Sequence, residues 1–156
     1  MTRDELKALL DDHLPAGTSP TICLATCDAR GPHVRPLSLV RDGLDLYFAT
    51  SRRSEKIHHL DSHHEVEFVC LLERVGEIGC LRVAGTVIEV TGAPLQEAWV
   101  RAHGYDAGLH FRRGLDDPDL IAFRIQPTLV RLRLPGQRER EIQAVLFASS
   151  DAPSSA

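Results

Sequence analysis

The sequence predicts a mainly β protein with added helices (β+α), built as a β-barrel of about six to seven mostly antiparallel strands with helices at its periphery. Short apolar or alternating segments recur along the chain, and Gly-containing turns join the first three of them. Those turns are too short for the crossover that parallel neighbours require. Helical spacing of apolar residues is confined to three short segments.

The first half of the chain predicts one helix followed by three strands. Apolar residues recur at helical spacing along Arg3–His13, and Thr2 with Glu5 forms a capping box before them. The strands are expected at Thr21–Cys27, Pro32–Val40 and Leu44–Thr50, separated by the turns DARG and RDG.

The second half predicts two helices and three further strands. The helices are expected at Ser54–Leu60 and at Pro94–Gly104, the latter with Pro at its start and Gly at its end. The strands are expected at Glu65–Leu72, Cys80–Gly92 and Leu120–Leu134, with a loop at Tyr105–Asp119. Gly85 and Pro127 lie inside the last two strands and predict a bulge or bend there.

Length and composition indicate one domain. A chain of 156 residues with 43% hydrophobic content is sized for a single compact core. We expect that domain to span residues 1–145 and the polar residues 146–156 to form a disordered tail. The net charge of -4 argues against a general nucleic-acid surface, so a local cluster of cations favours a small anionic ligand.

The sequence predicts a cytoplasmic protein with no membrane partner. The polar N-terminal residues 1–17 lack the apolar core of a signal peptide, and no apolar run approaches the roughly 20 residues needed to span a bilayer. The cysteines lie in or beside apolar runs, so we expect them to be reduced, buried, small hydrophobes. They are Cys23, Cys27, Cys70 and Cys80.

The stretch YFATSRRSEKIHHL, residues 47–60, gathers hydroxyls and cations at the turn between the third strand and the second helix. Thr50, Ser51 and Ser54 offer hydroxyl groups, the helix start offers backbone N–H groups, and Lys56 offers an ammonium group. These are the groups with which proteins bind phosphate. In the alternative interpretation Ser54 only caps the helix and the cations form a solvated face.

Arg35 lies within an apolar strand pattern, HVRPLSLV, where a buried guanidinium is costly unless it is paired. Two kinds of partner fit this position. One is an anionic ligand, and the other is a carboxylate on a neighbouring strand, such as Asp45 or Glu67.

Three motifs in order resemble the pyridoxamine 5'-phosphate oxidase-like family of FMN-binding split barrels, in particular its general-stress-protein branch. They are TCDARGPHVRPLSLV, DGLDLYFATSRRSEKIHHL and LRVAGTVIEV. The resemblance covers about Thr21 to Gly92, with a weaker echo at IAFRIQPTLVRL. It implies a split β-barrel, FMN as cofactor, and a homodimer with the flavins at the subunit interface.

The resemblance also implies roles for individual residues. Arg35 and Lys56 would contact the FMN phosphate, helped by the nearby hydroxyls, and the strand after Arg35 would run alongside the isoalloxazine ring. The implied cofactor-binding set is Arg35, Pro36, Leu37, Ser38, Thr50, Ser51, Ser54 and Lys56. No catalytic residue is implied.

The chain departs from the authentic oxidases of that family at several points. It has Glu55 where they carry a second basic residue, and Cys80 roughly where they have a glutamine. After Pro127 it lacks their C-terminal Arg-His pair. The resemblance therefore implies the FMN phosphate site more strongly than the vitamin B6 substrate site.

The eight histidines raise the question of a metal site, especially in HHLDSHH, residues 58–64. Their spacing is unlike that of a closed tetrahedral site, and no CxxC pair lies nearby. Histidines near a helix end interact favourably with the helix dipole. We therefore interpret this stretch as a solvated helix end and predict no metal site.

The function that follows is a flavin-dependent oxidoreductase acting on an unknown small molecule. Two alternatives remain open. One is a non-catalytic flavin-binding protein of the stress-response kind, which would share every motif. The other is a haem-binding relative, because the fold also hosts haem-binding proteins. That alternative requires a buried axial histidine.

Overall fold

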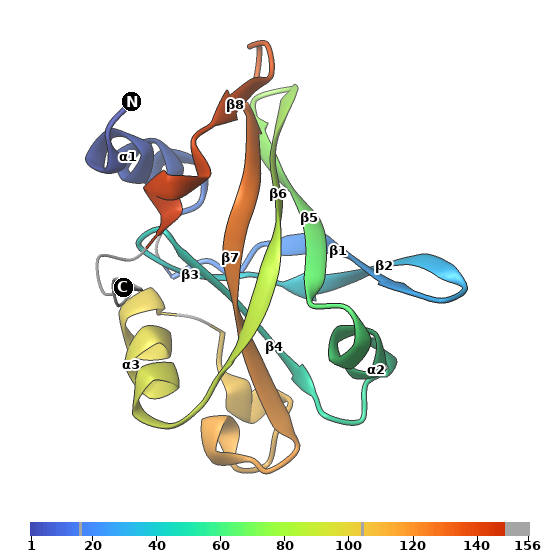
Figure 1. Ribbon diagram of the computed structural model, residues 1–156. Helices are drawn as coiled ribbons and strands as arrows, with labels where there is room; N and C mark the ends of the chain where they lie inside the picture. The colour runs from blue at the N-terminus through green and yellow to red at the C-terminus, as the bar shows by residue number, and fades with distance from the viewer. Residues whose placement is uncertain (16, 104, 149–156) are drawn as a thin grey trace, which may run out of the picture.

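The computed structural model describes residues 1–15, 17–103 and 105–148, which form a curled antiparallel sheet with three α-helices around it (Figure 1). The strands are β1 Thr21–Asp28, β2 Gly31–Ser38, β3 Val40–Asp42, β4 Asp45–Ser51, β5 Glu65–Arg74, β6 Glu77–Val90, β7 Leu120–Arg133 and β8 Arg140–Ile142. The α-helices are α1 Arg3–His13, α2 Glu55–Ser62 and α3 Gly92–Ala102, and the 3-10 helices are η1 Ala107–Leu109, η2 Gly114–Asp116 and η3 Ala144–Phe147.

The predicted fold class is confirmed: the sheet is a β+α split barrel. Its strand order is β2-β1-β5-β6-β7-β4-β3, with β8 paired to β7. Within the residues that the structure describes, the sheet has eight strands, more than the six or seven expected, for two reasons. The expected strand Pro32–Val40 divides at Leu39 into β2 and β3, and the short β8 was too polar to be recognised.

The main core lies inside the curl of the sheet. Leu24, Phe48, Phe68 and Leu81 meet there with almost no exposed surface, and Leu6 of α1 packs against them. A second, smaller cluster lies beneath α3, where Trp99 is buried and its indole N–H donates to the Tyr105 carbonyl at 3.2 Å. The sheet therefore buries side chains on both of its faces, one face against the main core and the other against α3.

The helices are short and peripheral. The predicted capping box of α1 is present: the Glu5 backbone N–H donates to Thr2 Oγ1 at 3.2 Å, and the Thr2 backbone N–H donates to Glu5 Oε2 at 2.7 Å. The capping box satisfies backbone donors that the first turn of a helix leaves open. Among the residues that the structure describes, no helix is long and apolar enough to cross a membrane.

Gly85 produces the predicted irregularity in β6. The register of β6 on β7 shifts between Ala84 and Gly85, and Gly85 lies opposite Pro127. A Cβ atom at this position would lie 2.2 Å from the Gln126 carbonyl oxygen, so only glycine fits. The bulge bends the two longest strands and so contributes to the curl of the sheet.

The expected burial of the cysteines is half right. All four are free, and Cys70 and Cys80 are buried, but Cys23 and Cys27 are exposed. The reason is strand periodicity, because β1 directs Ile22, Leu24 and Thr26 toward the core and its odd-numbered residues to the opposite face.

The C-terminal segment remains part of the fold beyond residue 145. Residues 146–148 of the expected tail are described, and within η3 the side chain of Phe147 is 3% exposed and packs into the main core. Residues 149–156 lie outside the described part of the chain. Phe147 therefore contacts the core although it lies within the residues expected to form the tail.

Replacing Phe147 with Ala should lower the free energy of unfolding by about 3 kcal/mol, because truncating a buried phenylalanine loses apolar burial and leaves a cavity. Urea denaturation measures the change. Val145→Ala in the same short helix is the matched control, since that side chain is 69% exposed and should cost less than about 0.5 kcal/mol. Equal losses for the two variants would mean that η3 does not dock on the core.

Candidate anion-binding site

The site lies where β2 and α2 approach each other at the open edge of the sheet. β4 ends at Ser51 and the chain turns directly into α2, which packs beneath the β1–β2 hairpin (Figure 1). Arg35 on β2 pairs in register with the buried Leu24 of β1, so both side chains lie on the α2 side of the hairpin. This arrangement brings Arg35 to residues that are distant in sequence.

Lys56 is the centre of the site. Its side chain is 9% exposed, and its ammonium group donates to Thr50 Oγ1 at 2.7 Å and to Ser54 Oγ at 2.8 Å. Ser54 is the N-cap residue of α2, but its hydroxyl makes no capping hydrogen bond and accepts from Lys56 instead. Ser54 is therefore at the predicted N-cap position, but its side chain binds Lys56 and does not cap the helix.

The charge of Lys56 is poorly compensated by the protein. Within the described parts of the chain its hydrogen-bond partners are hydroxyls, and no carboxylate forms an ion pair with it. Burial and, secondly, the nearby Arg35 guanidinium lower the pKa of Lys56. Both causes would be offset by an anion placed between the two cations.

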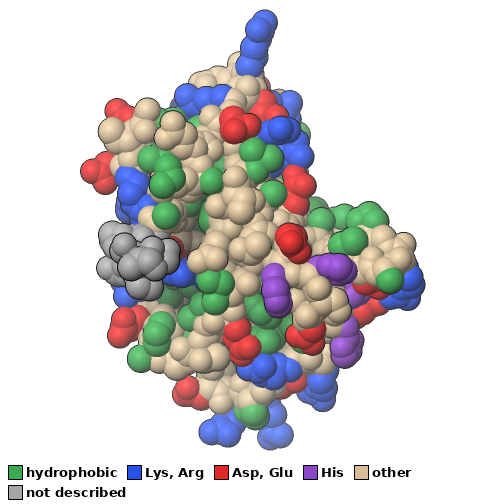
Figure 2. Space-filling model, viewed as in Figure 1, with side chains coloured by type: hydrophobic (Ala, Val, Ile, Leu, Met, Phe, Trp, Pro, Cys, Tyr) green, Lys and Arg blue, Asp and Glu red, His purple; other side chains and the backbone are tan. Residues whose placement is uncertain are grey.

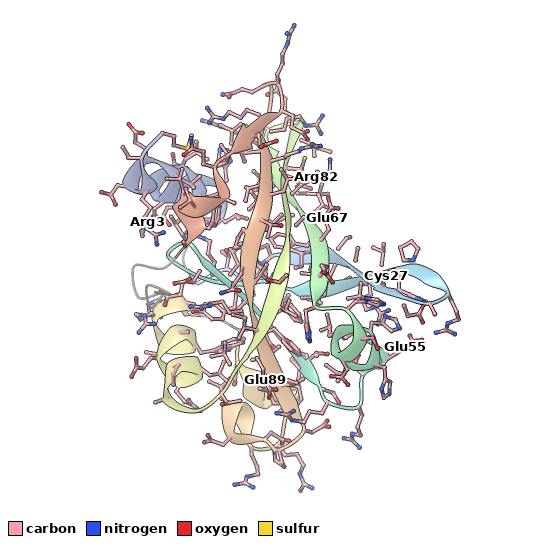
Figure 3. The ribbon with its side chains drawn as sticks, viewed as in Figure 1. Arg3, Cys27, Glu55, Glu67, Arg82 and Glu89 are labelled. Atoms are coloured by element: carbon pink, nitrogen blue, oxygen red, sulfur yellow. The ribbon has the colours of Figure 1, made fainter. Side chains whose placement is uncertain are left out.

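Arg35 has a weak partner that the sequence interpretation did not consider. Its guanidinium lies 4.0 Å from a carboxylate oxygen of Glu55, whereas Glu67 pairs at 2.7 Å with Arg82 on β6. Figure 3 shows Glu55 on α2, below the hairpin, and the Glu67–Arg82 pair on the adjoining strands. Glu55 is largely exposed and also accepts from Arg30 at 3.4 Å, so it neutralises Arg35 only in part.

Ser51 points away from Lys56. Its hydroxyl donates to Asp119 Oδ2 at 2.8 Å and accepts from the Arg53 backbone N–H at 3.1 Å. The Arg53 side chain binds both Asp119 oxygens at 3.1 Å, and these contacts hold the pKa of Asp119 below its usual value. Asp119 lies 68 residues from Ser51, so no local motif could have revealed it.

The residues expected beside a flavin ring follow Arg35 along β2. Leu37 pairs with Ile22 and packs partly against the main core, Pro36 is exposed, and Ser38 is half-buried at the end of the strand. The structure therefore brings Arg35, Thr50, Ser54 and Lys56 together and places the backbone of 36–38 in line with them.

A separate hollow lies between β7 and η3. It is lined by Asp45, Arg124, Gln126, Pro127, Val145 and Phe147, and it contains none of the residues expected at the anion site. Burial raises the pKa of Asp45 within it. Its mostly apolar lining offers one acid and one arginine, which is a different chemistry from that around Lys56.

The histidines of residues 58–64 do not behave alike. His58, His63 and His64 are exposed, as expected at a solvated helix end, but His59 is 2% exposed and faces β1. Figure 2 shows histidine side chains gathered on the part of this face that lies around α2. The interpretation of the whole stretch as solvated is therefore wrong for His59.

The curled antiparallel sheet, with a buried lysine at the start of α2 and an arginine facing it from β2, defines a split-barrel protein with a candidate anion site. The family model described as pyridoxamine 5'-phosphate oxidase matches residues 2–134. The chain belongs to this family. The matched residues 2–134 include the whole candidate site. The family is the one that the three sequence motifs resemble.

Known relatives agree with this assignment. General stress protein 26 of Bacillus subtilis is 25% identical over 130 residues, which are 81% of this chain and 85% of that protein. The crystal structure of General Stress Protein 26 from Bacillus anthracis aligns with a TM-score of 0.64 at 20% identity, covering 88% of this chain and 99% of that one. A heme binding protein from Mycobacterium smegmatis aligns with a TM-score of 0.74 at 14% identity, covering 94% of this chain and 60% of that one.

Replacing Lys56 with Met should leave the free energy of unfolding at pH 7 unchanged or raise it by up to about 2 kcal/mol, in the absence of any multivalent anion. The pKa of Lys56 is lowered on folding, so between that pKa and the unfolded value near 10.4 the unfolded state binds more protons. The wild-type protein therefore gains stability as pH rises through that window, and the variant lacks this gain.

Urea denaturation of both proteins at pH 7 and near pH 10.5 measures the difference. Lys7 is the other lysine of the chain and forms an exposed ion pair with Asp11 at 2.8 Å, so Lys7→Met is the matched control. A loss of more than about 1 kcal/mol in Lys56→Met at pH 7 would show that Lys56 stabilises the fold and is not held for a ligand.

Proposed function

We propose that this protein binds FMN and that Lys56, Thr50, Ser54 and Arg35 hold its phosphate. The observation that carries the proposal is the buried Lys56 ammonium, whose partners in the described structure are hydroxyls and whose like-charged neighbour is Arg35. A phosphate dianion would accept hydrogen bonds from all four side chains. Each charge-assisted bond contributes about 1.5–3 kcal/mol.

The same residues explain why a phosphate suits this site better than a carboxylate. Two hydroxyls, an ammonium and a guanidinium converge from β2, β4 and α2, and α2 begins beside them with its backbone N–H groups. A phosphate has three terminal oxygens that can accept from donors in three directions. The Ser51 hydroxyl donates to Asp119 and would have to break that hydrogen bond to bind the phosphate. We therefore expect Ser51 to contribute less to phosphate binding than the other residues.

The flavin would make the protein an oxidoreductase. Bound FMN supplies electron transfer at its ring, while the chain supplies binding, orientation and electrostatics. In this proposal the backbone of Pro36, Leu37 and Ser38 borders the ring, and the substrate is a small molecule. Free cysteines fit a cytoplasmic location, which we propose as well.

We further propose that the protein is a homodimer. The face of the β1–β2 hairpin opposite α2 carries exposed apolar side chains, including Cys23, Cys27 and Val34, and Leu71 of β5 extends it. Hydrophobic side chains are visible on the projecting hairpin in Figure 2. A contiguous apolar face of this kind is typical of a protein–protein interface. A partner chain here would lie beside β2 and could complete the flavin site.

A haem-binding function is the second candidate, because His59 is a buried histidine. His59 is 2% exposed beneath the β1–β2 hairpin, with its ring centroid 4.5 Å from that of His33 and its Nδ1 2.9 Å from the Thr26 hydroxyl. A porphyrin ring could not reach its Nε2 without separating the hairpin from α2. FMN is therefore the better proposal. The absorption spectrum separates the two candidates, because a bound flavin and a bound haem have different visible absorption bands.

The purified protein, mixed with FMN and freed of excess ligand, should retain a flavin absorption spectrum. Replacing both Arg35 and Lys56 with Ala should weaken FMN binding by about 100-fold or more, because at least two charge-assisted bonds are lost. Titration of flavin fluorescence measures the affinity. Riboflavin lacks the phosphate, so the wild type and the double variant should bind riboflavin with similar affinity.

The matched control replaces Arg52 and Arg53 with Ala. It removes two cations from the same turn, but these pair with Glu89 and Asp119 and should not touch the phosphate. A folded, dimeric wild-type protein that binds no FMN would refute the proposal. Oxidation of NADPH by the loaded protein would favour an enzyme over a flavin-binding protein without turnover.

A further inference from the structure

Asp28, His33 and His59 form a polar cluster between the β1–β2 hairpin and α2 that the proposed FMN site does not use. His33 Nε2 lies 2.9 Å from Asp28 Oδ1, and His59 Nε2 lies 3.6 Å from Asp28 Oδ2. The centroids of the two imidazole rings are 4.5 Å apart. One carboxylate and two imidazole nitrogens thus converge on a single point from three elements.

The surroundings of His59 orient it as a metal ligand. Its Nδ1 lies 2.9 Å from the hydroxyl of Thr26, a residue that is 3% exposed on β1. With Nδ1–H donating to that hydroxyl, the lone pair of Nε2 points toward Asp28 and His33. Histidines that bind metals in proteins are held in this way by a second hydrogen bond.

The geometry of the three ligand atoms suits a first-row transition metal. All three lie within 4.8 Å of one another, and a tetrahedral ion with bonds of about 2.1 Å needs ligand atoms roughly 3.4 Å apart. Small side-chain rotations close that difference. Asp28 and His33 are partly exposed, at 21% and 28%, so water can reach the remaining coordination position.

We propose that Asp28, His33 and His59 bind one divalent transition-metal ion of the zinc class, with water as a further ligand. Two imidazoles and one carboxylate favour such ions over Mg²⁺ or Ca²⁺, which prefer oxygen ligands. Binding of the ion requires the neutral His33 tautomer that carries its proton on Nδ1, so that the Nε2 lone pair is free to coordinate. Arg30, which binds the same carboxylate at 3.0 Å, is 71% exposed and can turn outward.

The proposed metal would connect the elements that carry the anion site. His33 lies two residues before Arg35 on the same face of β2, and His59 lies one turn after Lys56 on α2. A single ion bound to both elements would fix the separation between β2 and α2. The site is thus structural, and it does not depend on whether the bound anion is FMN.

Co²⁺ added to the flavin-free protein, without any affinity tag, tests the proposal. The wild-type protein should bind one equivalent and develop the visible absorption of Co²⁺ in a site of low coordination number. The single variants His33→Gln and Asp28→Asn should each abolish that band. Thr26→Val should weaken Co²⁺ binding by about 10- to 100-fold, because it removes the hydrogen bond that orients His59. Added Zn²⁺ should displace the Co²⁺.

Exposed histidines provide the matched control. His63→Gln combined with His64→Gln removes two histidines beside α2 and should leave the Co²⁺ band intact. His33 is partly exposed, so its variant should fold, and circular dichroism without metal verifies this. Two results would overturn the proposal. One is the absence of a Co²⁺ band in the wild type, and the other is a band that is lost in the His63/His64 variant but retained in the folded His33 variant.

Discussion

The burial of the Lys56 ammonium is the constraint on which the candidate site depends. Two hydroxyls satisfy its hydrogen bonds, but they carry no charge, and the nearby Arg35 adds a second positive charge. Taking a cation out of water costs several kcal/mol unless a counter-charge is supplied. β4, α2 and β2 hold these groups in place, and in the proposed function a ligand's phosphate supplies the counter-charge.

Strand periodicity separates the two faces of the β1–β2 hairpin. Arg35 and His33 alternate with Val34, so the cations and imidazoles face α2 while the apolar side chains face outward. In the proposed function, the polar inner face of this hairpin borders the ligand and its apolar outer face contacts the second chain. A one-residue change in register would exchange the two faces, and the tight turn between Asp28 and Gly31 prevents it.

Local patterns in the sequence predicted the fold class and the bulge at Gly85, and the family resemblance implied the approach of Arg35 to Lys56. They failed where contacts join distant segments: Asp119 takes the Ser51 hydroxyl, and Phe147 docks on the core. The exposure of Cys23 and the burial of His59 were missed for another reason. A continuous apolar run does not indicate which of its residues face outward. The two-residue turn of the hairpin, by contrast, fixes the strand register and would have predicted that His33 lies opposite Thr26.

The pKa of Lys56, measured with and without FMN, tests the central claim most directly. The chain contains two lysines, Lys7 and Lys56, so protein with ¹³C-labelled lysine gives two sets of Cε resonances, and a Lys56→Met sample assigns them. Without FMN the pKa of Lys56 should lie below the usual lysine value near 10.4, and saturating FMN should raise it. A Lys56 pKa that is unchanged by saturating FMN would contradict the account.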